Sequence, residues 1–261
     1  MTNNAGNAGA IPFGLQLFSI RHTCAADAGR NFPAVVAELA RMGYQGVEFA
    51  GYYGWGAADL RRILDDNGLS CCGAHVGIDL LLGDEVDKSV EFHRALGNRL
   101  LIVPVLPAQY RDSIDAWKRT AGVINGIAER LRPHGMFTGY HNHYVEFKPV
   151  GGEVPWEVFF SRTDADVVMQ VDVGNALEGG GDPFAMLERF PGRARTIHLK
   201  EFGSSPDAVI GQGEVDWKKL LDLAGRIGGT EWFIVEHERR ADRAMADVEM
   251  CLRYLEGVVR K

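Results

Sequence analysis

The sequence predicts a single (β/α)8 TIM barrel, and three observations support this fold class. Short apolar runs alternate with longer amphipathic segments along the whole 261-residue chain, a pattern typical of a parallel sheet covered by helices. The alternation gives about eight strand–helix units without a Gly/Ser-rich linker, in a chain close to the roughly 250 residues of such barrels. No GxGxxG motif follows the first strand, which disfavours an open dinucleotide-binding sheet.

The individual elements follow from apolar periodicity and from helix start and stop signals. Pro133-His134-Gly135 ends a long helix and begins a turn, and Pro183 suits the first position of a helix. The predicted strands are Phe13–Ser19, Gly46–Phe49, Ser70–Val76, Leu100–Val105, Phe137–His143, Val167–Val173, Arg195–Leu199 and Trp232–Glu236. The predicted helices are Phe32–Met42, Ala57–Asn67, Asp84–Leu96, Arg111–Arg132, Trp156–Phe160, Pro183–Arg189, Trp217–Arg226 and Asp242–Leu255.

Composition and charge narrow the class of protein. The chain is 46% hydrophobic, which is ample for one large core, and its net charge is −7 with dispersed Lys and Arg residues. Nucleic-acid binders need clustered basic side chains to displace counterions, so a nucleic-acid partner is not expected. No stretch approaches the roughly 20 apolar residues of a membrane span, so no membrane association is expected either.

The ends and the cysteines of the chain predict a cytoplasmic protein. Residues 1–10 contain neither a basic region nor an apolar core, so they are expected to be a disordered lead-in rather than a signal peptide, with one barrel domain over residues 11–261. Cys24, Cys71, Cys72 and Cys251 form neither a CxxC knuckle nor a disulfide framework. Buried thiols in a reducing compartment are the expected state.

Polar residues gather at the ends of the last four predicted strands. Active sites of TIM barrels are built from these carboxyl ends and from the loops after them. The four strand ends are Tyr140-His141-Asn142-His143, Val171-Asp172-Val173, His198-Leu199-Lys200-Glu201 and Val235-Glu236-His237-Glu238. A capping role is the simpler explanation for any single residue, but four consecutive strand ends with His, Asp, His and Glu indicate a shared metal. Imidazole and carboxylate ligands favour Mn²⁺, Zn²⁺, Fe²⁺ or Co²⁺ over Ca²⁺.

The first half of the chain adds a second set of polar residues. Gln16, Glu48 and His75 lie on the first three strands and are candidates for substrate binding. Hydrogen bonding inside the barrel is an equally good explanation for Gln16 and Glu48. His75 follows Cys72-Gly73-Ala74, where small residues leave room for a ligand.

The motifs resemble those of the xylose isomerase-like TIM barrels, specifically the sugar phosphate isomerase/epimerase group. The resemblance covers about residues 12–256. It rests on seven segments in the expected order: Gly14–Arg21, Gly46–Phe49, Tyr140–His143, Val171–Asn175, His198–Glu201, Gly211–Trp217 and Val235-Glu236. Each segment alone is weak evidence, and the set identifies the superfamily rather than a substrate.

The resemblance implies a metal site and a set of catalytic groups. Its positions match His141, Asp172, His198 and Glu236 as ligands of one divalent metal, with Mn²⁺ first and Zn²⁺, Co²⁺, Mg²⁺ or Fe²⁺ as alternatives. His141 stands where the family has Glu, so the paired-carboxylate mechanism of the ketose 3-epimerases is not simply copied, and His143 remains an alternative ligand or base.

The implied reaction starts with removal of a proton next to a carbonyl that the metal polarises. Glu236 and His143 are the candidate proton-transferring groups, Lys200 and His75 would hold or polarise hydroxyls, and Glu146 would partly replace the missing carboxylate.

The leading functional hypothesis is an isomerase or epimerase that acts on a keto-sugar or cyclitol. A lyase or dehydratase, of the inosose dehydratase kind or one that eliminates from 3-keto-glycosides, is the first alternative. A DNA-repair endonuclease and a non-catalytic sugar-binding barrel are further alternatives. Members of the family are often dimers or tetramers, so the resemblance also suggests a homo-oligomer.

Overall fold

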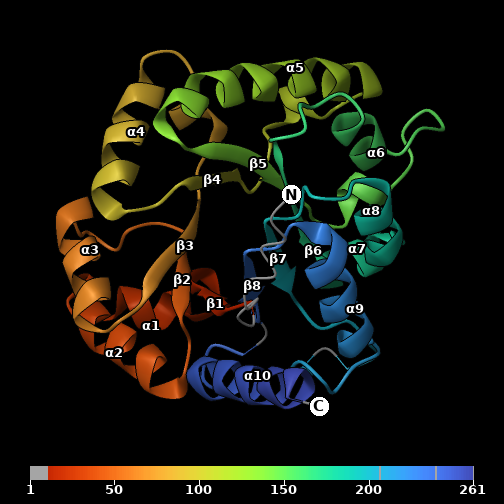
Figure 1. Ribbon diagram of the computed structural model, residues 1–261. Coiled ribbons are helices and arrows are strands. Elements are labelled where there is room, and N and C mark those ends of the chain that lie inside the picture. The colour runs from red at the N-terminus through yellow and green to blue at the C-terminus, as the bar shows by residue number, and fades with distance from the viewer. Residues whose placement is uncertain (1–10, 206, 239, 261) are drawn as a thin grey trace, which may run out of the picture.

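The predicted barrel is confirmed in a computed structural model, which describes residues 11–205, 207–238 and 240–260. Eight parallel strands close in sequence order, with β8 paired to β1, and helices surround them (Figure 1). The strands are β1 Phe13–Gln16, β2 Gly46–Phe49, β3 Ser70–His75, β4 Leu100–Val103, β5 Phe137–His141, β6 Val168–Asp172, β7 Thr196–Leu199 and β8 Trp232–Val235. The expected disordered lead-in, residues 1–10, lies outside the described residues.

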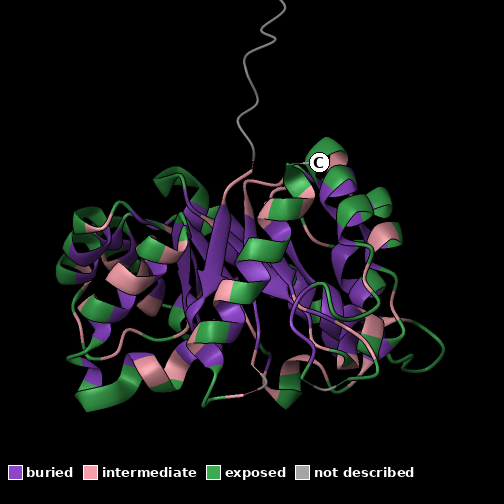
Figure 2. Cartoon of the chain, turned by 90° about the horizontal axis from the view of Figure 1, so that it is seen from below, coloured by how far each residue is buried: buried purple, intermediate pink, exposed green. Residues whose placement is uncertain are grey.

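Ten α-helices cover the barrel over the described residues. They are α1 Arg21–Ala25, α2 Phe32–Met42, α3 Ala57–Asp66, α4 Glu85–Leu96, α5 Ile114–Leu131, α6 Pro155–Phe160, α7 Val173–Gly179, α8 Pro183–Arg189, α9 Trp217–Leu223 and α10 Ala244–Val259. Figure 2 shows buried residues along the strands and on the inner sides of the helices, with exposed residues outside. None of the helices is both long and apolar enough to cross a bilayer within the described ranges.

Local signals in the sequence set most of the helix ends. The Ser113 hydroxyl caps α5 by accepting a hydrogen bond from the Ala116 amide, and Asp182 caps α8 ahead of Pro183. Helix α2 ends at Gly43, whose φ of 108° lies in the left-handed region that favours glycine.

The interior of the barrel has an apolar layer below a polar layer. Leu100 and Ile102 of β4 pack on Val168 of β6, with Phe137 of β5 against them. Because side chains alternate along a strand, Gln170 and Asp172 point to the same side of β6 as Val168 but nearer its carboxyl end. The apolar layer therefore supports a polar layer at the end of the barrel where the strands finish.

Several differences from the predicted elements concern the mouth of the barrel. Strand β4 ends at Val103 rather than Val105. Strand β1 ends at Gln16 rather than Ser19, because the Gln16 side chain accepts a hydrogen bond from the Phe18 amide and starts a 3-10 turn over Leu17–Ile20. Strand β5 ends at His141, so His143 lies in the following loop rather than on the strand. Helices α1 and α7 were not predicted, and α7 begins directly after Asp172.

Candidate metal centre and cavity

The tips of β5 to β8 bring four potential metal ligands together. Asp172 on β6 lies beside His198 on β7 in the strand register. One donor atom each of His141, Asp172, His198 and Glu236 lies within 4.8 Å of the others. Ligand atoms about 2.1 Å from a common ion lie at most about 4.2 Å apart. A small adjustment of the side chains would therefore place all four around one divalent cation.

Asp172 gives the clearest sign that this cluster fits a cation. Its Oδ1 accepts a hydrogen bond of 2.7 Å from the Asn175 amide and thereby caps α7. Its Oδ2 is buried and has no hydrogen-bond partner among the described residues. Burial raises the pKa of Asp172 to about 7, against the opposing effect of Lys200. A buried carboxylate oxygen without a partner is unfavourable, and a cation is the natural group to compensate it.

His198 is held between two carboxylates. Its Nδ1 lies 2.6 Å from Glu236 Oε2, and its Nε2 lies 2.6 Å from Glu48 Oε2. Burial lowers the pKa of His198, but the two carboxylates outweigh burial and raise it to about 10. In this state the imidazolium supplies the positive charge between them. A metal on Nδ1 would take over that charge, with Glu48 still orienting the ring through Nε2.

Gln170 organises the other histidines. Its amide group donates to Glu48 Oε1 and Thr196 Oγ1, both at 2.8 Å, so its Oε1 is left to accept from ring nitrogens. His75 Nε2 lies 2.8 Å and His141 Nδ1 3.2 Å from that oxygen. With Nδ1–H donating to Gln170, His141 presents Nε2 as a lone-pair ligand.

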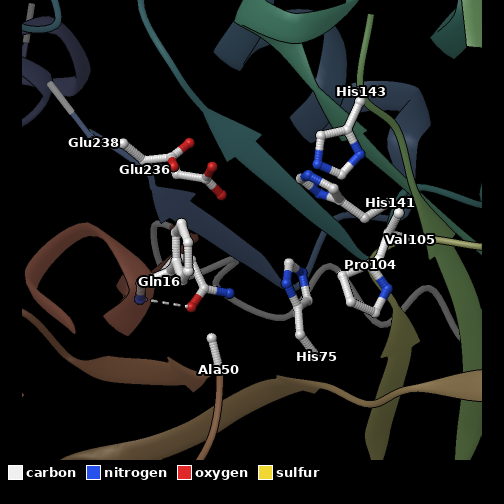
Figure 3. A pocket seen from close by; sticks show the side chains of 10 residues that line it. Gln16, Ala50, His75, Pro104, Val105, His141, His143, Glu236 and Glu238 are labelled. Atoms are coloured by element: carbon white, nitrogen blue, oxygen red, sulfur yellow. Dashed lines mark hydrogen bonds between the residues drawn. The ribbon is translucent and has the colours of Figure 1, made fainter. Parts of the chain in front are cut away.

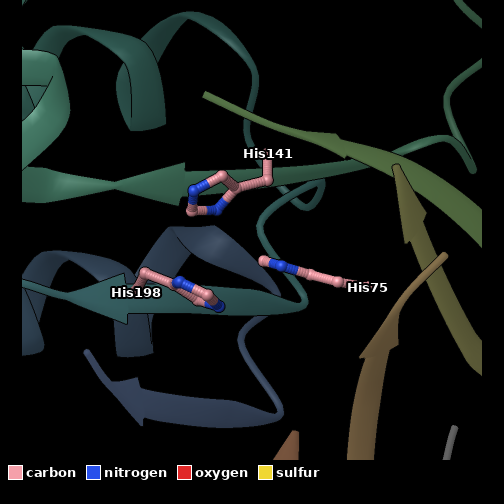
Figure 4. Close-up of side chains that lie close together, drawn as sticks. All are labelled: His75, His141 and His198. Carbon is pink, nitrogen blue, oxygen red and sulfur yellow. The ribbon is translucent and has the colours of Figure 1, made fainter. Parts of the chain in front are cut away.

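The three histidines of the site lie in contact with one another (Figure 4). The His75 and His198 rings stack at 5.3 Å between centroids, and one nitrogen each of His75, His141 and His198 lies within 4.8 Å of the others. Burial and the neighbouring His198 hold the pKa of His141 well below its ordinary value. The His141 imidazole is therefore neutral, which is the form that binds metals.

Lys200 connects the acidic side of the site. Its Nζ donates to Glu236 Oε1 at 3.2 Å and to Glu238 Oε1 at 2.5 Å. Burial lowers the pKa of Lys200, but the surrounding carboxylates, first Glu236, outweigh it and raise the pKa above its ordinary value. Burial likewise opposes ionisation of Glu236, but Lys200 and His198 keep its pKa well below the usual range. Lys200 is thus protonated and Glu236 ionised, and an ionised carboxylate is the form that can accept a proton.

A cavity of about 420 Å³ opens directly above the ligand cluster, a size typical of small-molecule sites. His75, His141, His143, Glu236 and Glu238 point into it (Figure 3). The complete lining is Gln16, Phe18, Ala50, His75, Pro104, Val105, His141, His143, Glu236 and Glu238.

Three of the expected site residues lie behind this lining. Glu48 is fully buried. Its carboxylate forms hydrogen bonds with His198 and Gln170 and does not face the cavity. Lys200 contacts Glu236 and Glu238 from behind. Glu146 accepts hydrogen bonds from the Tyr140 hydroxyl at 2.7 Å and the His143 amide at 2.9 Å, which fixes the loop after β5. We propose positioning roles for these three residues in place of direct substrate contact.

Two residues that the site uses, Gln170 and Asn142, were not expected from the sequence. Gln170 could have been found from alternation, because it lies two residues before Asp172 on the same face of β6. Glu238 was expected to share a face of the last strand with Glu236, but no role was assigned to it. Asn142 gave no comparable signal. Its Oδ1 accepts from the Asp172 amide at 2.9 Å and its Nδ2 donates to the Asp172 carbonyl at 3.1 Å, so it ties β5 to β6.

The space beside Gly73 is occupied by a side chain of the protein rather than left open for a ligand. Small residues before His75 were expected to leave room for a ligand. A Cβ at position 73 would instead lie 2.6 Å from Glu48 Oε1, so the Glu48 carboxylate fills that space.

Comparisons with known proteins agree with the fold and with the resemblance in the motifs. A family model described as the xylose isomerase-like TIM barrel matches residues 36–254. The rhizopine catabolism protein MocC of Rhizobium meliloti is 25% identical over 249 residues, covering 80% of this chain and 75% of the relative. An inosose dehydratase of Erwinia tasmaniensis is 25% identical over 254 residues, covering 82% and 85%.

Among solved structures, a sugar phosphate isomerase/epimerase of Parabacteroides distasonis superposes with a TM-score of 0.80 at 25% identity, covering 98% of this chain and 97% of the other. Relatives of this chain thus include dehydratases and isomerases or epimerases of sugars and cyclitols. The chain belongs to the xylose isomerase-like TIM barrel family.

Proposed function

We propose that the chain is a divalent-metal-dependent enzyme that removes a proton next to the carbonyl of a keto-sugar or cyclitol ketone and then expels water. The observation that carries this proposal is the joint placement of His143 and Glu236, two groups able to transfer protons, in one cavity above the His141, Asp172, His198 and Glu236 cluster. The similarity to inosose dehydratases supports a substrate of this class.

The metal would be held by His141, Asp172, His198 and Glu236, with Mn²⁺ as the first candidate and Zn²⁺, Co²⁺, Mg²⁺ or Fe²⁺ as alternatives. When bound, it supplies the Lewis acidity that makes a proton next to a carbonyl easier to remove. Glu48 and Gln170 orient His198 and His141 toward it. A hydrogen bond to the second ring nitrogen of a metal-binding histidine usually fixes the tautomer and the orientation of the ring.

The chain's own groups account for the proton transfers. Burial holds the pKa of His143 below its ordinary value, so the imidazole is neutral at neutral pH and can accept the proton. The C–H bond next to the carbonyl breaks, its proton passes to His143, and its electrons form the new C=C bond. The C–O bond on the following carbon breaks as its oxygen takes that proton back from His143 and leaves as water. Lys200 holds Glu236 and Glu238 where their oxygens can accept hydrogen bonds from substrate hydroxyls.

Isomerisation or epimerisation, which the sequence placed first, is the second candidate. Epimerisation needs a second proton-transferring group on the opposite face of the substrate, and Glu236 also lines the cavity. The similarity to a sugar phosphate isomerase/epimerase favours it. Elimination needs only one group that takes and returns a proton. Elimination comes first because His141 stands in place of the strand-five carboxylate that the epimerases use.

The test is proton exchange and turnover of 2-keto-myo-inositol and a panel of keto-sugars in D₂O with Mn²⁺. We expect exchange of the proton next to the carbonyl together with loss of water, both followed by NMR. Because the carbon next to the ketone of 2-keto-myo-inositol carries a hydroxyl, the first product is an enol that rearranges to a 1,2-diketone. His143→Asn should slow exchange and water loss by about 10²–10⁴-fold, whereas the exposed His134→Asn is the matched control. No exchange on any substrate by metal-loaded protein would refute the proposal, and exchange with inversion but without loss of water would favour epimerisation.

A further inference from the structure

A second cavity lies in the helical layer of the barrel, between α6 and α8 (Figure 1). Its volume is about 600 Å³, larger than the 420 Å³ of the cavity above the metal ligands, and both volumes are typical of small-molecule sites. Among the described residues, none lines both cavities. The proposed reaction therefore leaves this second cavity without a role.

The second cavity has an apolar, ordered wall. Six of its lining residues have apolar side chains and come from α6, α8 and the segments beside them: Phe147, Val154, Trp156, Ala185, Met186 and Phe190. The Phe147 and Phe160 rings pack on Trp156, with centroids 5.5 and 4.3 Å from it, so the indole is held in one orientation. A wall that is already ordered can cover an apolar group of a ligand with little further loss of conformational entropy.

The Trp156 indole is the unusual group in this wall. Trp156 is 1% exposed, and its Nε1 has no hydrogen-bond partner among the described residues. An indole N–H can only donate a hydrogen bond, and a buried donor without an acceptor is unfavourable. Because Trp156 lines the cavity, a ligand with an acceptor oxygen would supply the partner that this donor lacks.

The charged side chains of the cavity disfavour an anionic ligand. Four of its lining residues are charged and exposed: Glu157, Asp182, Glu188 and Arg189. The Arg189 guanidinium lies 3.3 Å from Glu157 Oε2, so the one cation of this set is already paired. Three carboxylates and one guanidinium leave a negative charge that repels an anion, and a cationic head would bring donors rather than an acceptor for Trp156. The ligand that fits is therefore uncharged.

We propose that this cavity is a second binding site, which takes an uncharged aromatic or aliphatic molecule whose carbonyl or ether oxygen accepts a hydrogen bond from Trp156. The ligand would also contact the segment that holds His143, because Phe147 lines the cavity and the adjacent Glu146 accepts a hydrogen bond from the His143 amide. The inference does not depend on the proposed reaction, since none of the four candidate metal ligands lines this cavity.

The test follows the indole proton of Trp156 by ¹H–¹⁵N NMR of the Zn²⁺-loaded protein, because Zn²⁺ is diamagnetic. The chain has five tryptophans, and the indole resonance that is missing from Trp156→Phe identifies this one. The probes are acetophenone and ethylbenzene, which share the same ring and differ in the carbonyl oxygen. We expect acetophenone to move the resonance further downfield than ethylbenzene and to reach saturation, because only acetophenone can accept the hydrogen bond.

Two variants locate the binding. Ala185→Leu places a larger side chain in the cavity from an exposed position of α8, and we expect it to abolish the acetophenone shift. Ala58→Leu makes the same change at an exposed position of α3 outside the cavity, and we expect it to keep the shift.

Four results would overturn the inference. The first is a Trp156 resonance that neither probe moves up to the solubility limit, and the second is an acetophenone shift that persists in Ala185→Leu. The third is transfer of magnetisation to the indole proton from a bound water that neither probe displaces, because solvent then satisfies the donor. The fourth is a resonance that moves with protein concentration rather than with the probe, which would make the cavity a contact between two copies of the chain.

Discussion

Replacing Glu48 with Gln tests whether the interior of the barrel tunes the metal site. Glu48 is fully buried, does not line the cavity, and contacts His198 Nε2 at 2.6 Å. Gln keeps the size of the side chain but removes the charge that orients and polarises the imidazole. Loss of such a partner typically weakens metal binding by about 10–100-fold, or roughly 1.4–2.7 kcal/mol.

The assay is titration of metal-free protein with Mn²⁺, followed by electron paramagnetic resonance of the free ion. Glu201→Gln is the matched control, because Glu201 is also buried but accepts hydrogen bonds from the 211–217 loop and the Trp217 indole. We expect the control to keep the wild-type affinity even if it is less stable. A folded Glu48→Gln protein with a dissociation constant within twofold of wild type would refute the positioning role.

Three further predictions concern neighbouring parts of the structure. Asp172→Asn should reduce bound metal to a trace, because it removes a ligand carboxylate. The metal-free variant should unfold at the wild-type temperature or higher, because the amide oxygen still caps α7 at Asn175 and a buried charge is removed. Metal analysis and calorimetry check both results, and retained metal would contradict the first. Gly73→Ala should lower the free energy of unfolding by about 1–3 kcal/mol through its clash with Glu48, and unchanged urea denaturation would show that the carboxylate can move. Burial lowers the pKa of His93 from 6.5 to about 4, so the unfolded chain takes up this proton first as pH falls. His93 should therefore reduce stability by about 2 kcal/mol between pH 7 and pH 5, and a His93→Gln variant with the wild-type pH dependence would exclude this.

The sequence was sufficient for the strand–helix order because that information is local and repeated. The period of the apolar residues identifies all eight strands, and their carboxyl ends must share one rim. Helix α7 was missed because it follows β6 without a loop, and because its cap is Asp172, which also ends β6. Asp172 was therefore interpreted only as the end of a strand, although it also begins a helix.

The placement of individual side chains depended on partners far along the chain. The sequence located Glu48 on β2, but its contact with His198 joins residues separated by 150 positions. Gln170 likewise bonds Glu48 across 122 positions. Glu146 follows β5 closely, yet the Tyr140 hydroxyl and the His143 amide turn it away from the cavity. Patterns within one strand cannot encode such contacts, because the orientation of a polar side chain is decided by the donors that surround it.

The most direct test of the metal centre is the metal content of the native protein, measured by plasma mass spectrometry after purification without chelators or a histidine tag. The proposed site predicts about one equivalent of Mn, Co, Fe, Mg or Zn per chain, lost in Asp172→Asn. About two or three equivalents of zinc would indicate a different, multinuclear site. No bound metal, even after incubation with Mn²⁺, would contradict the assignment of His141, Asp172, His198 and Glu236 as its ligands.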